Sequence, residues 1–360
     1  MLRKKAVFTG GGSAGHVTVN AALIPEFLKN QWDVIYIGSR TGIEKTIIEK
    51  EFPDIPYHFI SVGKLRRYFS LENVKDPFRV MIGVAQAFHI LKQECPDFVF
   101  SKGGFVSVPV VLAARLQKIP VIIHESDITP GLANKIAFPF AEKICTTFKE
   151  TESFLPKGKT VHAGAVLRNQ IFKGNAAKGK RICGFIKDKP VLLIMGGSLG
   201  AARINEAIID ILPRLLTDFQ IIHICGKGNV RSELIRPGYA AFEYVHEEIY
   251  DLLAASDIVV SRAGSNSIFE FLALQKPMLL IPLSPKASRG DQVLNAKCFE
   301  QAGLAMVLQE EELSSRSLQA GISELFSQRN EFFVRMNSYR SFKRADDMYK
   351  ILVRLIQPRK

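Results

Sequence analysis

Short runs of β-branched and aromatic residues alternate along the chain with longer segments whose apolar residues recur every three or four positions. The short runs are typical of buried strands, and the longer segments are typical of amphipathic helices that cover a sheet. In the first half this pattern predicts strands at 5–9, 33–37, 98–101, 121–124 and 143–147. It begins again with predicted strands at 191–195, 220–225, 258–261 and 278–282, and helices such as 202–216 and 267–274.

Alternation of strands and helices is the sequence form of βαβ units around a parallel sheet. Because the pattern occurs twice, we expect an α/β protein with two doubly wound, Rossmann-like domains facing a cleft. The predicted domains are 1–163 and 164–341, and a length of 360 residues suits two domains. Apolar residues at helical spacing predict a further helix over 342–356, and we expect this C-terminal segment, 342–360, to pack back on the first domain.

Composition narrows the class of protein. Hydrophobic residues make up 47% of the chain, which is enough for two cores, but no apolar run approaches the ~20 residues of a membrane-spanning helix. The five cysteines are far apart and form no C-x-x-C pair, which argues against a disulfide framework and against a zinc site. A formal net charge of +13 favours an anionic partner, such as a phosphorylated substrate, an acidic membrane surface or a nucleic acid.

Three glycine-rich turns follow predicted strands and precede predicted helices. They are 10–16 (GGGSAGH), 102–107 (KGGFVS) and 196–201 (GGSLGA). Turns of this kind present backbone N–H groups at the start of a helix, where anions bind. The turns therefore predict sites for a phosphorylated ligand in both domains.

The first turn also fits the dinucleotide-binding pattern G-x-G-x-x-G. Ser39 and Arg40, at the end of the following strand, would suit the 2′-phosphate of NADP, so a dehydrogenase stays open on the residues alone. The chain has no P-loop, no D-x-D and no clustered His and Asp residues, so no metal is expected at a diphosphate site. Helix N-termini and arginine would then neutralise a departing diphosphate.

The turn at 196–200 also fits the G-x-S-x-G nucleophile elbow of a hydrolase. Ser198 would be the nucleophile, with His223 and His246 as conceivable bases. The simpler interpretation of Ser198 is a hydroxyl and N–H donor to a diphosphate.

Two further features carry candidate chemistry. The segment 261–270 (SRAGSNSIFE) is a strand end, a small-residue turn and a helix start, and it is followed by 289–295 (RGDQVLN). Glu270 falls in the first helical turn, where it either complements the helix dipole or accepts ribose hydroxyls. His16, directly after the first turn, is either a structural hydrogen-bonding residue or a general base.

At these motifs the sequence resembles the MurG family over nearly the whole chain. The resemblance is carried, in order, by segments 11–16, 103–107, 124–127, 131–135, 196–198 and 262–270. It implies the two-domain glycosyltransferase B architecture. It also implies inverting transfer of N-acetylglucosamine from UDP-N-acetylglucosamine to undecaprenyl-diphosphate-linked muramoyl-pentapeptide (lipid I), which gives lipid II of peptidoglycan. No cofactor and no catalytic metal are implied.

The resemblance also implies roles for individual residues. His16 is the candidate base, Glu270 the ribose ligand and Val245 the backbone contact to uracil. The implied diphosphate ligands are Ser198, Arg168, Ser265, Asn266, Ser267 and Ile268. The implied sugar contacts are Gln292 and Asp127, and Ser13, Ala14 and Gly15 close the cleft from the other side. The implied acceptor and diphosphate loops contain Gly11, Gly12, Gly103, Gly104, Ser107 and Glu125.

The sequence departs from the family pattern at two motifs. Ser13 and Ala14 stand in the family's Gly-Gly-Thr-Gly-Gly-His, and the family's His-Glu-Gln-Asn is His-Glu-Ser-Asp here, ending at Asp127. An ionised Asp only accepts hydrogen bonds, whereas an amide also donates them. Two alternatives therefore stay open: a related transferase with another lipid acceptor, and a non-catalytic protein that binds nucleotide sugars.

A basic segment and an apolar helix predict contact with a membrane. The residues concerned are Arg66, Arg67, Phe69, Phe78, Met81 and Ile82. Basic residues beside exposed aromatic ones suit an anionic lipid surface, although a core helix with a solvated basic loop would give the same pattern. With a polyprenyl acceptor implied, we expect a peripheral protein on the cytoplasmic face of the cell membrane. Its expected partners include the two substrates, the anionic membrane surface and other cell-wall synthesis proteins, but no nucleic acid.

Overall fold

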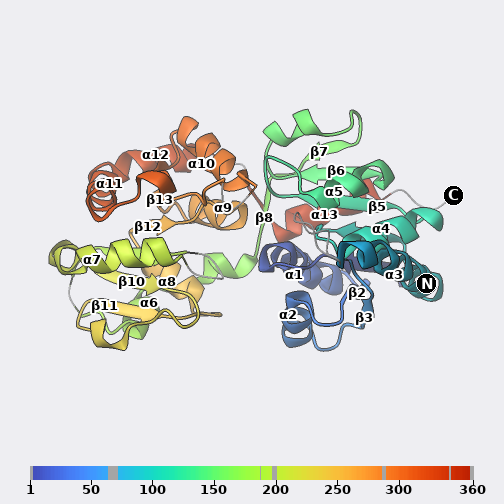
Figure 1. The fold of residues 1–360 in the computed structure, drawn as a ribbon, viewed down its shortest axis with the longest axis horizontal. Helices are drawn as coiled ribbons and strands as arrows, with labels where there is room; N and C mark the ends of the chain where they lie inside the picture. The colour runs from blue at the N-terminus through green and yellow to red at the C-terminus, as the bar shows by residue number, and fades with distance from the viewer. Residues whose placement is uncertain are drawn as a thin grey trace. The chain divides into compact units, whose positions relative to one another are not determined.

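The computed structural model describes residues 3–63, 72–186, 188–196, 201–285, 289–339 and 342–356 (Figure 1). The chain divides into two compact units. The first contains the described residues through Arg168 together with the C-terminal segment 342–356, and the second begins at Asn169. Gly164, where the sequence suggested a boundary, lies in the turn between the strands Thr160–His162 and Ala165–Leu167 of the first unit, with φ of +74°.

Each unit is built around one parallel sheet. Among the described residues, the sheet of the first unit has seven strands in the order β3-β2-β1-β4-β5-β6-β7, and that of the second has six in the order β11-β10-β9-β12-β13-β14. The pattern of two doubly wound α/β halves predicted from the sequence is confirmed. In both sheets the order reverses beside the first strand, between β1 and β4 and between β9 and β12, where ligands bind in open α/β sheets.

The elements of the first unit are β1 (Lys5–Thr9), α1 (Ala14–Lys29), β2 (Asp33–Ser39), α2 (Ile43–Glu51), β3 (Tyr57–Ile60), α3 (Glu72–Glu94), β4 (Phe98–Ser101), α4 (Ser107–Leu116), β5 (Val121–Glu125), α5 (Leu132–Ala137), β6 (Lys143–Thr146), β7 (Thr160–His162), β8 (Ala165–Leu167), β15 (Phe342–Arg344) and α13 (Ala345–Leu355). Short 3-10 helices span Phe138–Phe140 and Glu150–Phe154.

The elements of the second unit are α6 (Ala176–Ile182), β9 (Val191–Met195), α7 (Ala202–Asp218), β10 (Gln220–Ile224), β11 (Tyr239–Phe242), α8 (Ile249–Ala255), β12 (Ile258–Ser261), α9 (Ser265–Ala273), β13 (Met278–Leu280), α10 (Asp291–Gln301), β14 (Met306–Val307), α11 (Ser315–Ser327) and α12 (Arg329–Ser338). Short 3-10 helices span Asn169–Lys173, Ser232–Leu234 and Glu310–Glu312.

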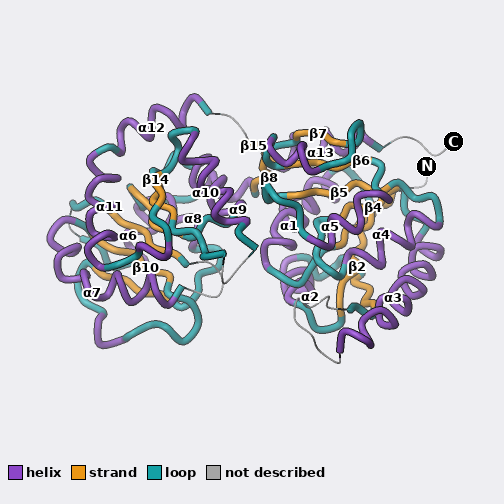
Figure 2. The backbone as a smooth tube through the Cα atoms, turned by 45° about the horizontal axis from the view of Figure 1, so that its top comes forward, coloured by secondary structure: helices purple, strands orange, loops and turns teal. Residues whose placement is uncertain are grey.

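Alternate residues of each strand belong to the two faces of the first sheet. Phe8 lies in a core with α1, α2 and α13, and its neighbour Val7 lies in a second core with α3 and α4. Helices therefore cover both faces of this sheet (Figure 2). Burial on both faces explains why the strands are continuous apolar runs in the sequence. In the second unit the main core is formed by the sheet with α7 and α11.

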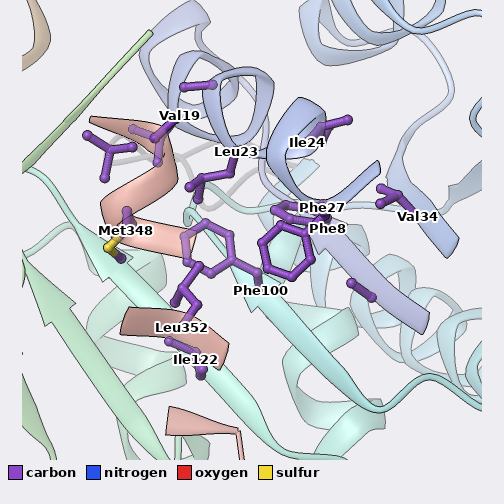
Figure 3. Close-up of a cluster of buried hydrophobic side chains, with 14 of the residues drawn as sticks. Phe8, Val19, Leu23, Ile24, Phe27, Val34, Phe100, Ile122, Met348 and Leu352 are labelled. Atoms are coloured by element: carbon purple, nitrogen blue, oxygen red, sulfur yellow. The ribbon is translucent and has the colours of Figure 1, made fainter. Parts of the chain in front are cut away.

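The C-terminal segment joins the first core. Met348 and Leu352 of α13 are fully buried, and Figure 3 shows them beside Phe100 and Ile122 of the sheet. Trp32 Nε1 donates to Tyr349 Oη at 3.1 Å. The predicted helix from residue 342 is wrong in its first three residues, because Phe342–Arg344 form β15 and pair in parallel with β8. These residues gain partners for their backbone in the ladder before the helix begins at Ala345.

Candidate functional site

The glycine loop between β1 and α1 is held by side chains from three elements. Tyr36 Oη donates to Gly10 O at 2.6 Å, and Asn20 Nδ2 donates to both Tyr36 Oη and Thr9 O. Gly12 has a φ of +85°, which a residue with a side chain rarely adopts. The loop therefore has a defined shape at the switch point of the sheet.

His16, in the first turn of α1, is oriented by this loop. Its Nδ1 lies 2.9 Å from Gly11 O and 3.0 Å from Ser13 Oγ. A carbonyl oxygen only accepts, so Nδ1 carries the proton and donates it to Gly11 O. In the neutral ring the lone pair is then on Nε2, which is the nitrogen able to take a proton from a substrate.

The buried carboxylate of Glu44, in the first turn of α2, also holds the glycine loop. Its Oε2 accepts the Gly12 N–H at 3.1 Å, and its Oε1 accepts from Ser39 N at 3.0 Å and from Ser39 Oγ. Gly11 N–H donates to Gly103 O at 3.3 Å. The sequence suggested that Gly11 and Gly12 present N–H groups to an anion, but both groups are engaged inside the domain because an internal carboxylate and a carbonyl accept them.

The second glycine turn, after β4, lies against the first. Gly104 has a φ of +80°, and a Cβ there would lie 2.1 Å from Gly11 O and 3.2 Å from His16 Nδ1. Ser107 Oγ donates to Gly104 O at 2.8 Å, and Gly103 N–H donates to Ser101 Oγ. The predicted loop residues Gly103, Gly104 and Ser107 thus set the shape of the surface beside His16.

Glu125, at the end of β5, organises the third loop. Its Oε1 accepts from the N–H groups of Ser126 and Asp127, and its Oε2 accepts from Gly131 N and Asn134 Nδ2. Burial raises the pKa of Glu125, and the positive charge of Lys102 acts in the opposite direction. Because its oxygens are engaged, Glu125 supports the loop that carries Asp127.

The predicted donor residues of the second unit lie after the carboxyl ends of its strands. Ser265–Ile268 form the first turn of α9, after β12. Ser265 and Ile268 are buried, while Asn266, Ser267 and Glu270 are half-buried. Glu270 lies in the second turn of α9 rather than in the first, because the helix begins at Ser265, two residues before the predicted start. Val245 lies in the loop between β11 and α8. Ser198 lies outside the described residues, after β9.

Gln292 lies in the first turn of α10, where its Oε1 accepts from Leu283 N at 3.0 Å. One turn later, Asn295 Nδ2 donates to Ala263 O at 3.3 Å, which joins α10 to the turn before α9. The helix that carries Gln292 is therefore hydrogen-bonded to the turn that precedes α9. Arg168 lies at the end of the first unit, and its Nη1 is 3.4 Å from Glu51 Oε1.

A buried ion pair, which no motif in the sequence predicts, supports the α9 turn. Arg262 Nη2 donates to Glu310 Oε1, and Arg262 Nη1 donates to Ile281 O at 3.1 Å. Glu310 Oε2 accepts from Ser284 N at 2.8 Å. Burial raises the pKa of Glu310, but the Ser284 N–H and Arg262 outweigh it, so the net pKa is lowered. The two partners are 48 positions apart, and no local pattern in the sequence joins them.

The geometry removes the support for the dehydrogenase alternative and for His223 as the base of a hydrolase. His223 is buried, its Nε2 lies 3.0 Å from Asn205 Oδ1, and its Nδ1 lies 3.0 Å from Tyr239 Oη. Both ring nitrogens are therefore occupied in the core. Ser39 donates to Glu44, and the Arg40 guanidinium lies over the Phe59 ring at 4.5 Å, so neither side chain is directed to a 2′-phosphate.

An exposed apolar face runs along α3. Phe78 is 67% exposed, Met81 68% and Ile82 53%. Gln117 Nε2 donates to Phe88 O at 2.7 Å, which joins the end of α4 to α3, and the neighbouring Leu116 is exposed. Arg66, Arg67 and Phe69 lie outside the described residues. In the described part of the chain, no helix is long and apolar enough to span a bilayer, and no three His, Cys, Asp or Glu side chains gather as a metal site.

Comparisons with known proteins give matches over both units. The model of the glycosyltransferase family 28 N-terminal domain matches residues 6–146, and that of the C-terminal domain matches 191–349. A UDP-N-acetylglucosamine--N-acetylmuramyl-(pentapeptide) pyrophosphoryl-undecaprenol N-acetylglucosamine transferase of Geobacillus thermodenitrificans is 56% identical over 357 residues, which are 99% of each chain. The protein of the same name from Clostridium botulinum is 54% identical over 358 residues, again 99% of each chain.

Solved structures share the fold. The crystal structure of Acinetobacter baumannii MurG has a TM-score of 0.77 at 23% identity and covers 98% of this chain and 99% of its own. A UDP-GlcNAc 2-epimerase from Neisseria meningitidis, bound to UDP-GlcNAc, has a TM-score of 0.67 at 15% identity over 99% of each chain. At these identities the likeness concerns the fold alone.

Proposed function

The chain belongs to the MurG family within glycosyltransferase family 28, and from that premise we propose which of its residues carry out the reaction. The enzyme transfers N-acetylglucosamine from UDP-N-acetylglucosamine to lipid I, and so forms lipid II for peptidoglycan. The observation that carries the residue assignment is the orientation of His16, whose Nδ1–H is committed to Gly11 O.

We assign His16 the role of general base. Its Nε2 takes the proton of the acceptor 4-hydroxyl while the oxygen forms a bond to the anomeric carbon of the donor sugar. The bond between that carbon and the diphosphate oxygen breaks, and its electron pair leaves with UDP. A single in-line displacement inverts the configuration at the anomeric carbon. The loops of Gly103, Gly104, Ser107 and Glu125 shape the acceptor side.

The second unit is assigned the donor. Glu270 accepts the ribose hydroxyls, the Val245 backbone contacts uracil, and Gln292 contacts the hydroxyls of the sugar. The first turn of α9, with Ser198 and Arg168, neutralises the diphosphate as it gains charge, because backbone N–H groups at a helix start favour an anion. Asp127 is assigned a sugar contact. Ser13, Ala14 and Gly15 close the site from the acceptor side.

The exposed face of α3 is assigned to an anionic membrane surface. Its three most exposed apolar side chains, Phe78, Met81 and Ile82, are suited to insertion among lipid headgroups. Arg115 and Lys118, beside Leu116, are exposed cations that an anionic surface would attract. A peripheral position on the cytoplasmic face of the membrane would bring the enzyme to its lipid-linked acceptor and to other cell-wall synthesis proteins.

The test of these roles is transfer of radiolabelled N-acetylglucosamine from its UDP donor to a short-chain lipid I analogue, in EDTA. We expect the wild type to be active and His16→Ala to lose about 100-fold or more in kcat with little change in donor affinity. Glu270→Ala is expected to weaken UDP binding by about tenfold or more, because a ribose contact is lost. Equal loss of turnover and donor binding in His16→Ala would indicate a structural role, and unchanged UDP affinity in Glu270→Ala would refute the ribose contact.

A further inference from the structure

A single peptide group connects a buried carboxylate to the His16 imidazole. The carbonyl of the Gly11–Gly12 peptide accepts the proton of His16 Nδ1 at 2.9 Å. The N–H of the same peptide donates to Glu44 Oε2 at 3.1 Å. Glu44 comes from a different element, α2, and lies 32 positions away from Gly12 in the chain. Glu44 belongs to none of the motifs of the sequence.

We propose that Glu44 is a positioning residue for the reaction, and that it acts on His16 through the Gly11–Gly12 peptide. The inference rests on the proposed role of His16 as the base. A negative charge at the N–H end of a peptide polarises it and makes its carbonyl a stronger acceptor. The stronger acceptor keeps the proton on Nδ1 and stabilises the imidazolium that forms when Nε2 takes the substrate proton. In the Ser-His-Asp triad the carboxylate contacts the imidazole directly, whereas here one peptide lies between them.

Hydrogen bonds engage both oxygens of the Glu44 carboxylate. The residue is fully buried, and both carboxylate oxygens accept hydrogen bonds from backbone N–H groups, those of Gly12 and Ser39. Ser39 also donates its hydroxyl, and Tyr57 Oη holds Ser39 by donating to its carbonyl at 2.7 Å. These three donors hold the carboxylate in place beside the Gly11–Gly12 peptide.

The peptide is confined from two sides, as a positioning role requires. A Cβ at residue 11 would lie 2.4 to 2.7 Å from the atoms of the Glu44 carboxylate. A Cβ at residue 104 would lie 2.1 Å from Gly11 O. Only glycine at both positions lets the carboxylate and the second loop approach the peptide this closely. The peptide plane, and with it the direction of its carbonyl, is therefore fixed.

Other ionisable groups face the same loop. Tyr36 Oη donates to Gly10 O, and Lys102 has its Cβ close to Gly10. The charge of Lys102 acts on His124 and Glu125, at the end of β5, and Asp127 acts on Glu125. These groups are unchanged in the variants proposed below, so a change in the titration of His16 reports the charge at residue 44.

The test compares Glu44→Gln with the wild type in two measurements on the full chain. The first is kcat/KM against pH with the short-chain acceptor, and the second is an NMR titration of the His16 ring, assigned by the signal missing in His16→Ala. The uncharged side chain should stabilise the imidazolium less. We expect the pKa of His16 and the acid limb of the profile to move down together by roughly half a unit or more, and kcat to fall about tenfold with the KM for UDP-N-acetylglucosamine within about twofold.

Glu49→Gln is the matched control, because it removes a carboxylate from an exposed position on the same helix. It should leave both titrations unchanged. A lower kcat in Glu44→Gln with an unmoved His16 titration would overturn the proposal in favour of a purely structural role. If His16→Ala keeps full turnover, the base assignment fails and this inference fails with it. If His16→Ala is inactive while the His16 ring of Glu44→Gln titrates as in the wild type, only this inference fails.

A second variant keeps the proposal testable if Glu44→Gln does not fold. Ser39→Ala removes the hydroxyl donor to the carboxylate and leaves its charge less neutralised. The His16 pKa should then move upward, opposite in sign to the effect of Glu44→Gln. A pKa that stays in place or moves downward in Ser39→Ala would overturn the proposal.

Discussion

Gly104 and Gly158 have the same φ of +80°, but their surroundings differ. A Cβ at Gly158 would meet nothing within 4 Å, whereas a Cβ at Gly104 would collide with Gly11 O beside His16. A comparison of the two glycines therefore distinguishes the effect of the left-handed backbone, which both share, from the effect of steric contact, which only Gly104 has. We interpret Gly104 as a requirement of the site and Gly158 as a requirement of its turn alone.

Gly104→Ala should therefore reduce kcat by about tenfold or more, because the Gly11 carbonyl that orients His16 has to move. Gly158→Ala should lower stability by about 1–2 kcal/mol through its left-handed backbone and leave kcat unchanged. Thermal unfolding and the transfer assay distinguish the two effects. Equal kcat values in the two variants would contradict the proposed contact.

His223 gives the second unit a dependence on pH. Burial lowers the pKa of His223 to about 4, from an ordinary value of 6.5. The unfolded chain then binds more protons than the folded one between these values, so stability falls as the pH decreases through this window. The loss between about pH 7.5 and pH 5 should be roughly 2 kcal/mol.

His223→Gln should remove most of this dependence, although it is expected to lower stability at neutral pH by weakening the contacts to Asn205 and Tyr239. Thermal unfolding of the full chain at both pH values is the measurement. His246→Gln is the control, because His246 is exposed in the same unit. The assignment to His223 would be refuted if His223→Gln and wild type lost stability equally on acidification.

At the scale of elements, α13 is part of the first core although it is the last helix that the structure describes. Met348 is fully buried in the cluster that contains Phe8 and Phe100. Met348→Ala should cost about 2–5 kcal/mol of unfolding free energy, whereas Lys350→Ala, on the exposed side of the helix, should stay within about 0.5 kcal/mol of the wild type. Denaturant unfolding of the full chain tests this. Similar free energies of unfolding for the two variants would mean that packing of α13 does not stabilise the first core.

The face of α3 provides the second test at this scale. The triple variant Phe78→Ser, Met81→Ser and Ile82→Ser should bind anionic vesicles at least about tenfold more weakly, because the side chains expected to insert are lost. Its kcat with a soluble short-chain acceptor should be unchanged. Phe154→Ser removes a 52% exposed aromatic residue elsewhere in the same unit and serves as the control. Unaltered vesicle binding by the triple variant would exclude this face as the membrane contact.

At the scale of the whole molecule, the features predictable from the sequence are the local ones. The strands β1, β4, β9 and β12 have the predicted bounds, because a buried parallel strand is a continuous apolar run with a turn after it. The beginning of the C-terminal helix was wrong, because β15 exists only through its pairing with β8, which lies far away in the sequence.

In the candidate site, too, local features are predictable from the sequence and contacts between distant elements are not. The glycine turns and the position of His16 at the start of a helix can be predicted from the sequence. The contact of Glu44 with Gly12 and the pairing of Arg262 with Glu310 are not, since each depends on two elements that only the folded sheet brings together. The N–H groups of Gly11 and Gly12 look open to an anion in the sequence, but the fold provides their acceptors from within.

The return of the C-terminal segment to the first unit bears on how the protein is made. A ribosome synthesises the chain from its N-terminus, and domains usually fold in that order. Here the first unit lacks Ala345, Met348 and Leu352 of its core until the entire second unit has been synthesised. The second unit, which begins at Asn169, can complete its own core earlier. The unit that starts first is therefore completed after the second, and its apolar surface around Phe27 and Trp32 stays uncovered until α13 has been synthesised.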